Sequence, residues 1–591
     1  MKRNRLQSIK NYGLPFALTV CMSACGVLEP VDDNHATIDR VYENPSYAEG
    51  VLMAAYTRLP TNSLSFNEVA TDDAVSNDKL NGYLRMATGQ WSAIYNPVSQ
   101  WENCIAAIQS INQFLGLVDE VNWKKSIPEL QWMYTQRFKG EAYALRALFQ
   151  YHLLVTTAGP GAGGQMLGIP VIDHFLDVNA DFNIPRATFE QSVAQIYSDI
   201  DHSLEYLTMN DYRNITDAGQ LPPGYEKVSV VNYNIIFGNE LNQRINAKMA
   251  KALRARVALL EASPAFNTGN TALWQKAAGF AGESLSSIGG ISGIDPAGHR
   301  FYLKPLVDAV NVSAGSPIDQ KEILWRRSVT NSNTREMANF PPSLFGRGNV
   351  NPTQNLVDAF PAANGYPIGN PASNYSASSP YDNRDPRLKL YIAYNGNTFS
   401  GKPIITGLGG GVNAKDSTEN STRTGYYLKK LLVEEVNLNP VSTTTQKHYE
   451  VHMRYTELFL IYAEAANEAW GPDGAGTAGF SARDVIQALR KRAGIAQPDA
   501  YLASVVTKED MRKVIRNERR LELCFEGFRF WDLRRWKENL TEPARGININ
   551  GSAMTVVEVE PRVFTNEYMH YGPLPETEVV KYSALIQNKG W

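Results

Sequence analysis

The stretch Ile515-Arg-Asn-Glu-Arg-Arg-Leu-Glu-Leu-Cys-Phe-Glu-Gly-Phe-Arg-Phe-Trp-Asp-Leu-Arg-Arg-Trp536 combines an amphipathic helical pattern with densely mixed acidic and basic residues. Glu518, Glu522 and Glu526 are four residues apart, so they share one face of the helix. Two carboxylates facing each other are also what a glycoside hydrolase uses as its acid and its base or nucleophile. The stretch therefore allows two interpretations, a catalytic pair or a structural charge network.

Arginines within and directly after this helix favour the structural interpretation. They are Arg516, Arg519, Arg520, Arg529, Arg534 and Arg535. Each carboxylate thus has a cation within helical reach, and we expect an Arg–Glu network that fixes the last helices to the body. The sequence has no H-E-x-x-H or G-x-S-x-G motif. We predict no enzyme, and a surface glycoside hydrolase is the less favoured alternative.

Further segments are rich in alanine and have the 3.6-residue hydrophobic period of helices. They span residues 130–154, 187–207, 245–262, 455–469, 482–491 and 508–525. Alternation of small and large apolar residues lets helices pair closely, as in tetratricopeptide repeats, but the regular spacing of about 34 residues is missing. Ser481 and Thr507 are predicted N-caps. The predicted fold is mainly α, with tetratricopeptide-like helix pairs forming a single body.

Residues about 290–450 have a different composition, rich in Gly, Pro, Asn, Ser and Tyr. The runs 388–394 and 426–432 have the pattern of short strands. We therefore expect a loop-rich, irregular, ligand-binding lobe with short strands. The helical body then comprises about residues 41–290 and 450–591.

The first 24 residues are predicted to be an export signal, with a basic start and a short apolar stretch. The sequence Met22-Ser-Ala-Cys25-Gly resembles the lipobox of bacterial lipoproteins; Cys21 is a weaker candidate because branched Val20 precedes it. Cleavage would make Cys25 the lipidated N-terminus of a tether over residues 25–40. Removing the signal takes away four positive charges and changes the formal net charge from −3 to −7.

Charge and cysteine content exclude several classes of protein. The chain has 57 Lys plus Arg against 60 Asp plus Glu, without the basic segment of a nucleic-acid-binding protein, so we expect no nucleic-acid partner. Cys104 and Cys524 are isolated and lack ligand spacing, so we predict neither a metal site nor a disulfide framework. No cofactor is expected.

The C-terminal stretch and other motifs resemble the SusD/RagB family. The resembling segments are 139–154, 185–207, 351–360, 381–387 (Tyr-Asp-Asn-Arg-Asp-Pro-Arg), 454–468, 485–494, 515–536 and 571–578. Members are outer-membrane lipoproteins of Bacteroidetes that capture glycans, or peptides in some branches, and deliver them to a TonB-dependent SusC-like transporter. The resemblance implies such a transporter, a glycan or peptide ligand and the outer membrane as partners, and a lipid-anchored, surface-exposed location.

Candidate ligand-binding residues follow from the chemistry of sugars, whose apolar C–H faces suit aromatic rings and whose hydroxyls suit carboxylates, amides and arginine. The segment 71–101 offers this mixture, and in the family this region contributes to the ligand site. The predicted contacts are Asp72, Asp73, Asn77, Tyr83, Arg85, Trp91, Tyr95 and Asn96, with Trp325 and Phe340 in the irregular lobe. The alternative for each ring is packing in the core.

The sequence leaves the identity of the ligand open. Trp and Tyr side chains suit an oligosaccharide, which we favour, but they also suit a peptide. A tetratricopeptide-like assembly scaffold that binds no small ligand is a third hypothesis, from a different class of protein.

Overall fold

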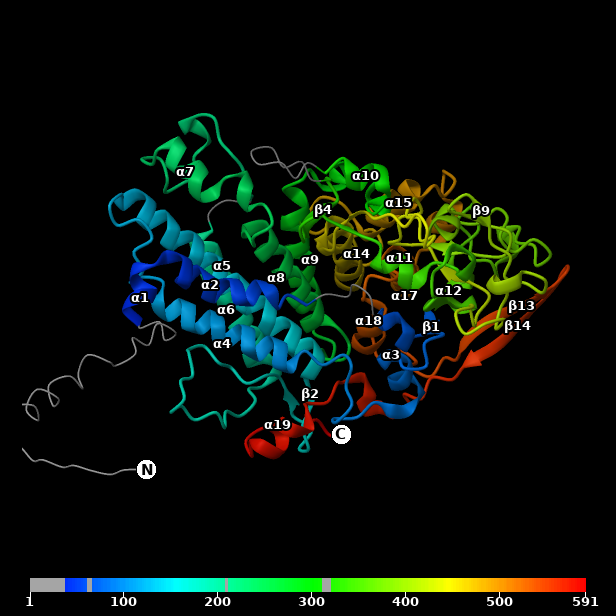
Figure 1. Ribbon diagram of the computed structural model, residues 1–591, viewed down its shortest axis with the longest axis horizontal. Coiled ribbons are helices and arrows are strands. Elements are labelled where there is room, and N and C mark those ends of the chain that lie inside the picture. Colours follow the sequence, from blue (N-terminus) through cyan, green and yellow to red (C-terminus); the bar gives the residue numbers. More distant parts are fainter. Residues whose placement is uncertain (1–37, 61–65, 208–210, 311–319) are drawn as a thin grey trace, which may run out of the picture.

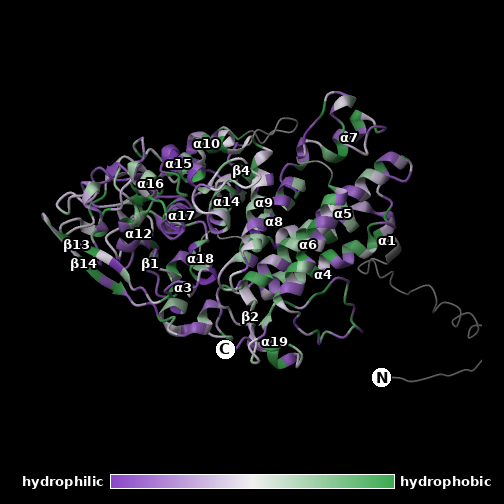
Figure 2. Cartoon of the chain, turned by 180° about the vertical axis from the view of Figure 1, so that it is seen from behind, coloured by the Kyte–Doolittle hydropathy of each residue, from purple (hydrophilic) through white to green (hydrophobic). Residues whose placement is uncertain are grey.

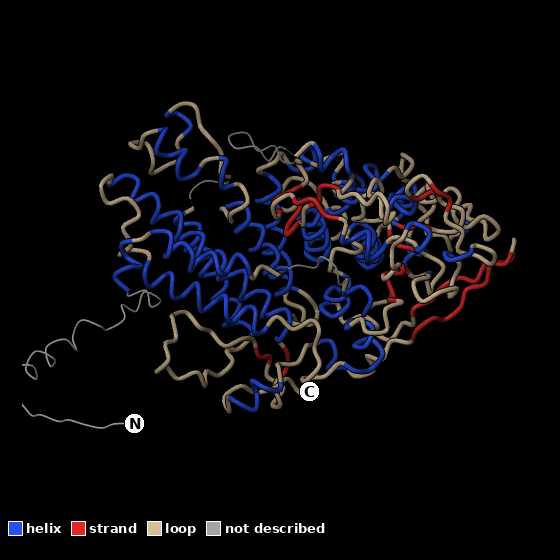
Figure 3. The backbone as a smooth tube through the Cα atoms, in the orientation of Figure 1, coloured by secondary structure: helices blue, strands red, loops and turns tan. Residues whose placement is uncertain are grey.

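The computed structural model describes residues 38–60, 66–207, 211–310 and 320–591. The predicted signal, Cys25 and most of the tether therefore lie outside the described residues. Helices dominate one side of the molecule, while loops and short strands dominate the other (Figures 1 and 3). The prediction of a mainly α fold is confirmed.

The helical body consists of long helices together with several short ones. Their bounds are α1 (Ile38–Glu43), α2 (Pro45–Thr57), α4 (Trp101–Leu117), α5 (Pro128–Thr157), α6 (Phe189–Tyr206), α7 (Val230–Phe237), α8 (Ala247–Ala262), α9 (Thr271–Ser286), α14 (Tyr455–Trp470), α15 (Ala482–Ala493), α16 (Ala500–Ser504), α17 (Lys508–Glu522), α18 (Arg529–Arg535) and α19 (Glu576–Lys581). Successive helices pack side by side, as α5 does with α6 and α8 with α9. All six segments with a helical period form helices close to the expected bounds.

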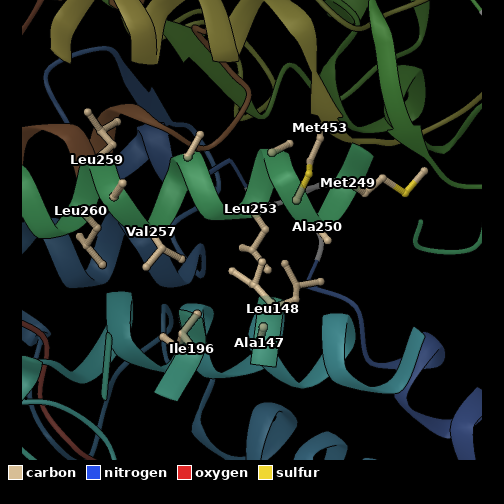
Figure 4. Close-up of a cluster of buried hydrophobic side chains, with 14 of the residues drawn as sticks. Ala147, Leu148, Ile196, Met249, Ala250, Leu253, Val257, Leu259, Leu260 and Met453 are labelled. Carbon is tan, nitrogen blue, oxygen red and sulfur yellow. The ribbon is translucent and has the colours of Figure 1, made fainter. Parts of the chain in front are cut away.

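The core of the body depends on small residues that let helices approach one another. Figure 4 shows Ala147 and Leu148 of α5 facing Leu253 of α8, with Ile196 of α6 beside them; all four are buried. Figure 2 shows how hydrophobic residues are distributed over these helices. Burial of such side chains, at roughly 25 cal/mol per Å² of apolar surface, is the main driving force for assembling the pairs.

Helix ends follow the expected capping chemistry. Ser481 accepts a hydrogen bond from the Asp484 backbone N–H and forms a capping box, and α15 ends at Gly494, whose φ of 97° suits glycine. Thr507 caps α17 through the Asp510 N–H. Both predicted N-caps are confirmed.

The irregular lobe contains short helices and most of the strands. Its helices are α10 (Lys304–Asp308), α11 (Thr334–Asn339), α12 (Gln354–Ala359) and α13 (Pro386–Tyr391); a further short helix, α3 (Gly82–Arg85), precedes α4 in the chain. The strands of the whole described chain are β1 (Ala74–Ser76), β2 (Gly159–Pro160), β3 (Met166–Leu167), β4 (Ile323–Arg326), β5 (Thr330–Ser332), β6 (Val350–Pro352), β7 (Ile392–Ala393), β8 (Thr398–Phe399), β9 (Lys402–Pro403), β10 (Tyr427–Leu428), β11 (Gln446–His448), β12 (Val451–Arg454), β13 (Ala544–Asn550) and β14 (Ala553–Glu560).

Every strand pair of the described residues is antiparallel, and several join distant segments. β1 pairs with β6, which fixes the predicted ligand segment to the lobe, and β4 pairs with β12, which leads directly into α14. A second hydrophobic cluster fills the lobe and includes Phe66 and Phe525, which come from outside residues 290–450. The division into body and lobe at these boundaries stays a prediction.

The expected strand over residues 388–394 is wrong for its first half. Residues up to Tyr391 continue α13, and only Ile392 and Ala393 form a strand. The reason is local: Asp385 caps the helix by accepting from the Arg387 N–H, and Pro386 stands at the first helical position, where its fixed φ suits a helix.

A buried ion network joins the lobe to the body around Glu522, which is 0% exposed. Its carboxylate accepts from Arg492 of α15 (2.6 Å) and from Arg387 of α13 (3.0 Å). Arg454 at the end of β12 reaches it at 3.3 Å and also binds Glu526 at 2.7 Å. Burial alone raises the pKa of Glu522, but the three arginines outweigh burial and hold the pKa well below its usual range. The expected structural Arg–Glu network is therefore present, but its cations are not the expected ones: none of the arginines of residues 515–536 binds these glutamates, whose partners come from distant segments.

Replacing Glu522 by Gln would leave three buried arginines short of one negative charge. We expect Glu522→Gln to lower the free energy of unfolding by about 3–5 kcal/mol. Glu509→Gln, at an exposed position of the same helix, should change it by less than about 0.5 kcal/mol. Urea unfolding followed by circular dichroism measures both, and equal stabilities for the two variants would contradict the assigned role of the network.

Candidate functional site

A cavity of about 290 Å³, here called the central cavity, lies where the helical body meets the lobe. Its walls come from α5, α8 and α14, from β12 and from the segment 525–535 that contains α18. The volume is near the lower end of the range of roughly 300–1,000 Å³ that is usual for ligand pockets. A cavity with apolar walls and converging polar groups is the first candidate for a binding site.

Several aromatic rings in the wall are only partly buried. They include Tyr83, Tyr151, Phe528 and Trp531. Tyr151 lies beside His152, with ring centroids 5.5 Å apart. Phe530 supports Trp531 edge-to-face at 4.9 Å. Rings held in this way offer flat apolar faces on which a sugar ring can stack.

Ion pairs across neighbouring elements hold the cavity wall together. Arg256 of α8 binds Glu457 of α14 through two hydrogen bonds of 2.7 and 2.5 Å. Arg535 of α18 binds Glu464 of α14 at 2.6 and 2.7 Å. Burial raises the pKa of Glu464, but Arg535 outweighs burial and the pKa falls to about 2. The Arg535–Glu464 pair is therefore charged near neutral pH, and both pairs fix helices rather than offer catalytic groups.

Two histidines of the wall are neutral near neutral pH. Burial, reinforced by nearby arginines such as Arg256, lowers the pKa of His152 and of His452 to about 3. The His452 ring lies 4.9 Å from the Trp325 ring. In the part of the chain that the structure describes, no group of three His, Cys, Asp or Glu side chains is placed to hold a metal ion. The cavity thus presents stacking and hydrogen-bonding groups.

Of the ligand-binding residues predicted from the sequence, Tyr83 and Trp325 line the central cavity. Tyr83 is partly exposed there. Trp325 is 2% exposed, and its Nε1 donates to the backbone oxygen of Gln243 at 2.9 Å. Trp325 is therefore part of a rigid wall rather than an exposed platform.

Asp72 and Asp73 have a structural role in place of the predicted hydroxyl contacts. Both are buried, and they bind Arg520 and Arg529 of the C-terminal helices. Arg529 contacts Asp72 through two bonds of 2.9 Å, and Arg520 Nε lies 2.7 Å from Asp73. Burial opposes the charge on Asp72, but the two arginines prevail and hold its pKa far below the usual range. Carboxylates engaged in this way are not free to bind a sugar.

The other predicted residues of segment 71–101 lie outside the cavity wall. Trp91 is buried and donates to Asn96 at 2.9 Å, which occupies both side chains. Arg85 stacks on Tyr95 at 4.7 Å. These side chains bind one another outside the central cavity, and their role as ligand contacts stays a prediction.

Asn77 and Phe340 also have partners within the protein. Asn77 donates to the backbone oxygen of Arg347 at 2.9 Å, so it joins the segment to the lobe. Phe340 is 1% exposed and packs against Phe399 at 5.0 Å. Burial in the lobe core removes Phe340 from contact with a ligand in the central cavity.

Sequence reasoning missed the rings that do face the cavity. Phe528 and Trp531 lie in the C-terminal stretch, which was interpreted only as a charge network, and Tyr151 lies on a helix interpreted only as packing. Trp531 and Phe528 flank arginines, and this aromatic–cation alternation is the signal in the sequence that could have indicated them.

Comparison with known proteins agrees with this arrangement. Residues 321–591 match the SusD family, and residues 33–218 match a SusD-like group described as starch-binding and associating with the outer membrane. The chain belongs to the SusD family. The SusD-like protein P2 of Formosa agariphila is 32% identical over 143 residues, which are 23% of this chain and 25% of that relative.

Solved structures share the fold of this SusD-family chain. A SusD-like protein of Bacteroides fragilis, 21% identical, covers 95% of this chain and all of its own length with a TM-score of 0.71. A SusD-like carbohydrate-binding protein of the same organism, 19% identical, covers 92% of this chain and 99% of its own, with a TM-score of 0.66. Surface glycan-binding protein A of Bacteroides fluxus, 17% identical, covers 93% and 100%, with a TM-score of 0.58.

One buried acid of this SusD-family chain has no cation bound to it. Glu68 is 0% exposed and lies next to Asn67 of the cavity wall. Its Oε1 accepts from the backbone N–H of Gly527 at 2.7 Å. Burial raises the pKa of Glu68 to about 7, and this hydrogen bond offsets only part of the effect.

A carboxyl group whose pKa is raised in the folded state is protonated at a higher pH in the folded protein than in the unfolded chain. Its contribution to stability is therefore fully present below about pH 4.5 and is lost as the pH rises to about 7. At about 1.4 kcal/mol for each pKa unit, the loss is on the order of 3 kcal/mol. We expect Glu68→Gln to remove this loss, so that the variant gains stability relative to the wild type between pH 5 and 8.

Urea unfolding at a series of pH values measures the difference. Glu205→Gln, at an exposed position of α6, is the matched control and should follow the wild type at every pH. A difference between wild type and Glu68→Gln that does not vary with pH would contradict the raised pKa.

Proposed function

We propose that this protein binds a glycan in the central cavity, without catalysis, and passes it to a SusC-like TonB-dependent transporter in the outer membrane. The observation that carries the proposal is the set of partly exposed rings around that cavity, Tyr83, Tyr151, Phe528 and Trp531. Two of the similar solved structures are described as carbohydrate-binding or glycan-binding proteins, which supports a glycan rather than a peptide.

The state of the acidic residues supports binding rather than hydrolysis. Glu518 and Glu522 are buried and held by Arg387, and Glu526 is held by Arg454 and Lys430. A hydrolase needs one protonated acid and a second carboxylate beside the scissile bond. Carboxylates fixed by buried cations are poor candidates for either role.

Localisation at the outer membrane rests on two lines of support. The match of residues 33–218 is to a group described as associating with the outer membrane, and Cys25 follows a lipobox-like sequence. None of the described helices is both long and apolar enough to span a bilayer. We infer a lipid anchor at Cys25 and exposure at the cell surface, where a transporter can receive the glycan.

Trp531 is the residue whose replacement tests the binding site. We expect Trp531→Ala to weaken glycan binding about tenfold or more, because loss of a stacked ring costs on the order of 1.4 kcal/mol. Isothermal titration calorimetry with oligosaccharides from a panel of neutral and acidic polysaccharides measures the affinity.

Trp132→Ala is the matched control, since Trp132 is an exposed tryptophan of α5 outside the cavity wall. Equal affinities for the two variants would contradict a site in the central cavity. Binding of peptides but of no oligosaccharide would favour the peptide alternative, and release of reducing ends by the wild type would contradict a non-catalytic role.

Purification from outer membranes should recover a TonB-dependent transporter with the protein, and its absence would contradict the proposed delivery.

A further inference from the structure

Tyr151 and His152 of α5 line the central cavity, and their side chains form no hydrogen bond with another described residue. Both side chains are only partly buried. The Tyr151 Oη atom and the two ring nitrogens of His152 keep solvent-accessible surface, whereas Nε and Nη2 of Arg534 in the same wall are sealed off by their surroundings. A ligand in the cavity can therefore reach the polar atoms of Tyr151 and His152.

The Tyr151 hydroxyl lies among charged groups from three other helices of the wall. Burial raises the pKa of this hydroxyl, and the charges of Arg256 in α8, Glu457 in α14 and Arg535 in α18 also act on it. Trp531 stands four residues before Arg535 in α18, so both side chains are on one face of that helix. The hydroxyl and the stacking ring therefore line the same space.

Tyr151 and His152 both offer a donor and an acceptor. Burial and the nearby charge of Arg256 lower the pKa of His152 to about 3, so its ring is neutral and has one N–H group and one acceptor nitrogen. A tyrosine hydroxyl likewise donates and accepts. Sugar hydroxyls also do both, whereas a carboxylate or a sulfate only accepts and an ammonium group only donates. The two side chains thus match hydroxyls better than charged groups.

The charged side chains of the wall already have partners within the protein. All four carboxylates that line the cavity lie beside cations: Glu450 is near Arg335, Glu457 binds Arg256, Glu526 binds Arg454, and Asp532 binds Arg519 and Arg535. Arg534 forms no ion pair with a described residue, but its guanidinium is enclosed and packs on the Phe530 ring at 3.5 Å. A charged ligand would lose its hydration here without gaining a free counter-ion among the described residues.

We propose that Tyr151 and His152 determine the specificity of the central cavity by binding sugar hydroxyls, so that the cavity selects uncharged glycans over acidic and amino glycans. This proposal rests on the proposed function and names the class of glycan and the residues that recognise it. Trp531 supplies the stacking face. Because the cavity is small, only a short uncharged segment of the glycan enters it.

Calorimetry with matched neutral and charged probes tests the selectivity. The first panel contains neutral malto-, cello- and xylo-oligosaccharides, acidic oligogalacturonates and cationic chitosan oligosaccharides, and we expect its tightest-binding member to be neutral. That member is then compared as its hydroxyethyl and carboxymethyl derivatives of equal substitution. We expect the hydroxyethyl form to bind about tenfold or more tightly than the carboxymethyl form, because the two substituents differ mainly in charge.

The outcomes separate this proposal from the proposed function. A charged oligosaccharide that binds more tightly than every neutral one, with binding sensitive to Trp531→Ala, would overturn the selection of uncharged glycans and retain the proposed function. Equal affinities for the hydroxyethyl and carboxymethyl forms would overturn the selection as well. Binding of no oligosaccharide would overturn both proposals.

Replacement of the two side chains tests their role in recognition. Tyr151→Phe removes one hydroxyl and keeps the ring, and it should weaken binding of the neutral oligosaccharide about three- to tenfold, the effect of one lost hydrogen bond. His152→Leu should weaken binding to a similar extent, whereas His152→Gln keeps a neutral donor and acceptor and should retain more of the affinity. Tyr47→Phe, at an exposed position of α2 outside the cavity wall, is the matched control. Wild-type affinity in both Tyr151→Phe and His152→Leu would overturn the proposal.

The stability of the ligand-free protein provides a second readout. Because the Tyr151 hydroxyl has no hydrogen-bond partner within the described chain, we expect Tyr151→Phe to keep the Tm of the wild type. The neutral oligosaccharide should raise the Tm of the wild type more than that of Tyr151→Phe, because it binds the wild type more tightly. A lower Tm of ligand-free Tyr151→Phe together with unchanged oligosaccharide affinity would assign the hydroxyl to the fold and overturn its role in recognition.

Discussion

The geometry of this protein depends on one buried carboxylate, Glu522, that is shared by three arginines. Arg387 comes from the lobe, Arg454 from the end of β12 and Arg492 from α15, so a single side chain fixes three segments that are distant in the sequence. Buried ion pairs contribute little net stability compared with apolar packing, but removing one partner leaves a charge that the interior cannot solvate. The network therefore specifies how lobe and body meet, and with that it specifies the shape of the central cavity.

The same chemistry explains why most charges around the cavity serve the fold. Asp72 binds Arg529 and Glu464 binds Arg535, so neither acid is available for a ligand or for proton transfer. Arg534 is buried without a carboxylate partner among the described residues and lies instead against the Phe530, Phe564 and Trp91 rings. Paired charges give the cavity rigid walls, and partly exposed rings give it stacking faces.

The sequence predicted the parts of this structure that arise from local patterns. Helical periods placed the long helices, and Ser481 and Thr507 were correct as caps. The charge pattern of residues 515–536 indicated a structural ion network but not its partners, since Glu518 and Glu522 bind the distant Arg387. Pairing at long range could not be read from residue types, since Asp72 meets Arg520 across 448 positions of the chain. For the same reason Trp91 and Phe340 looked like ligand contacts but are buried, while Trp531 was interpreted only as part of a helix.

The central claim is that a glycan binds between the body and the lobe, in the cavity that the ion network shapes. A crystal structure of the protein with a bound oligosaccharide tests it most directly. The predicted result is electron density for a sugar ring against Trp531 in the central cavity. Density for the sugar on the outer surface, with the central cavity unchanged, would contradict the claim.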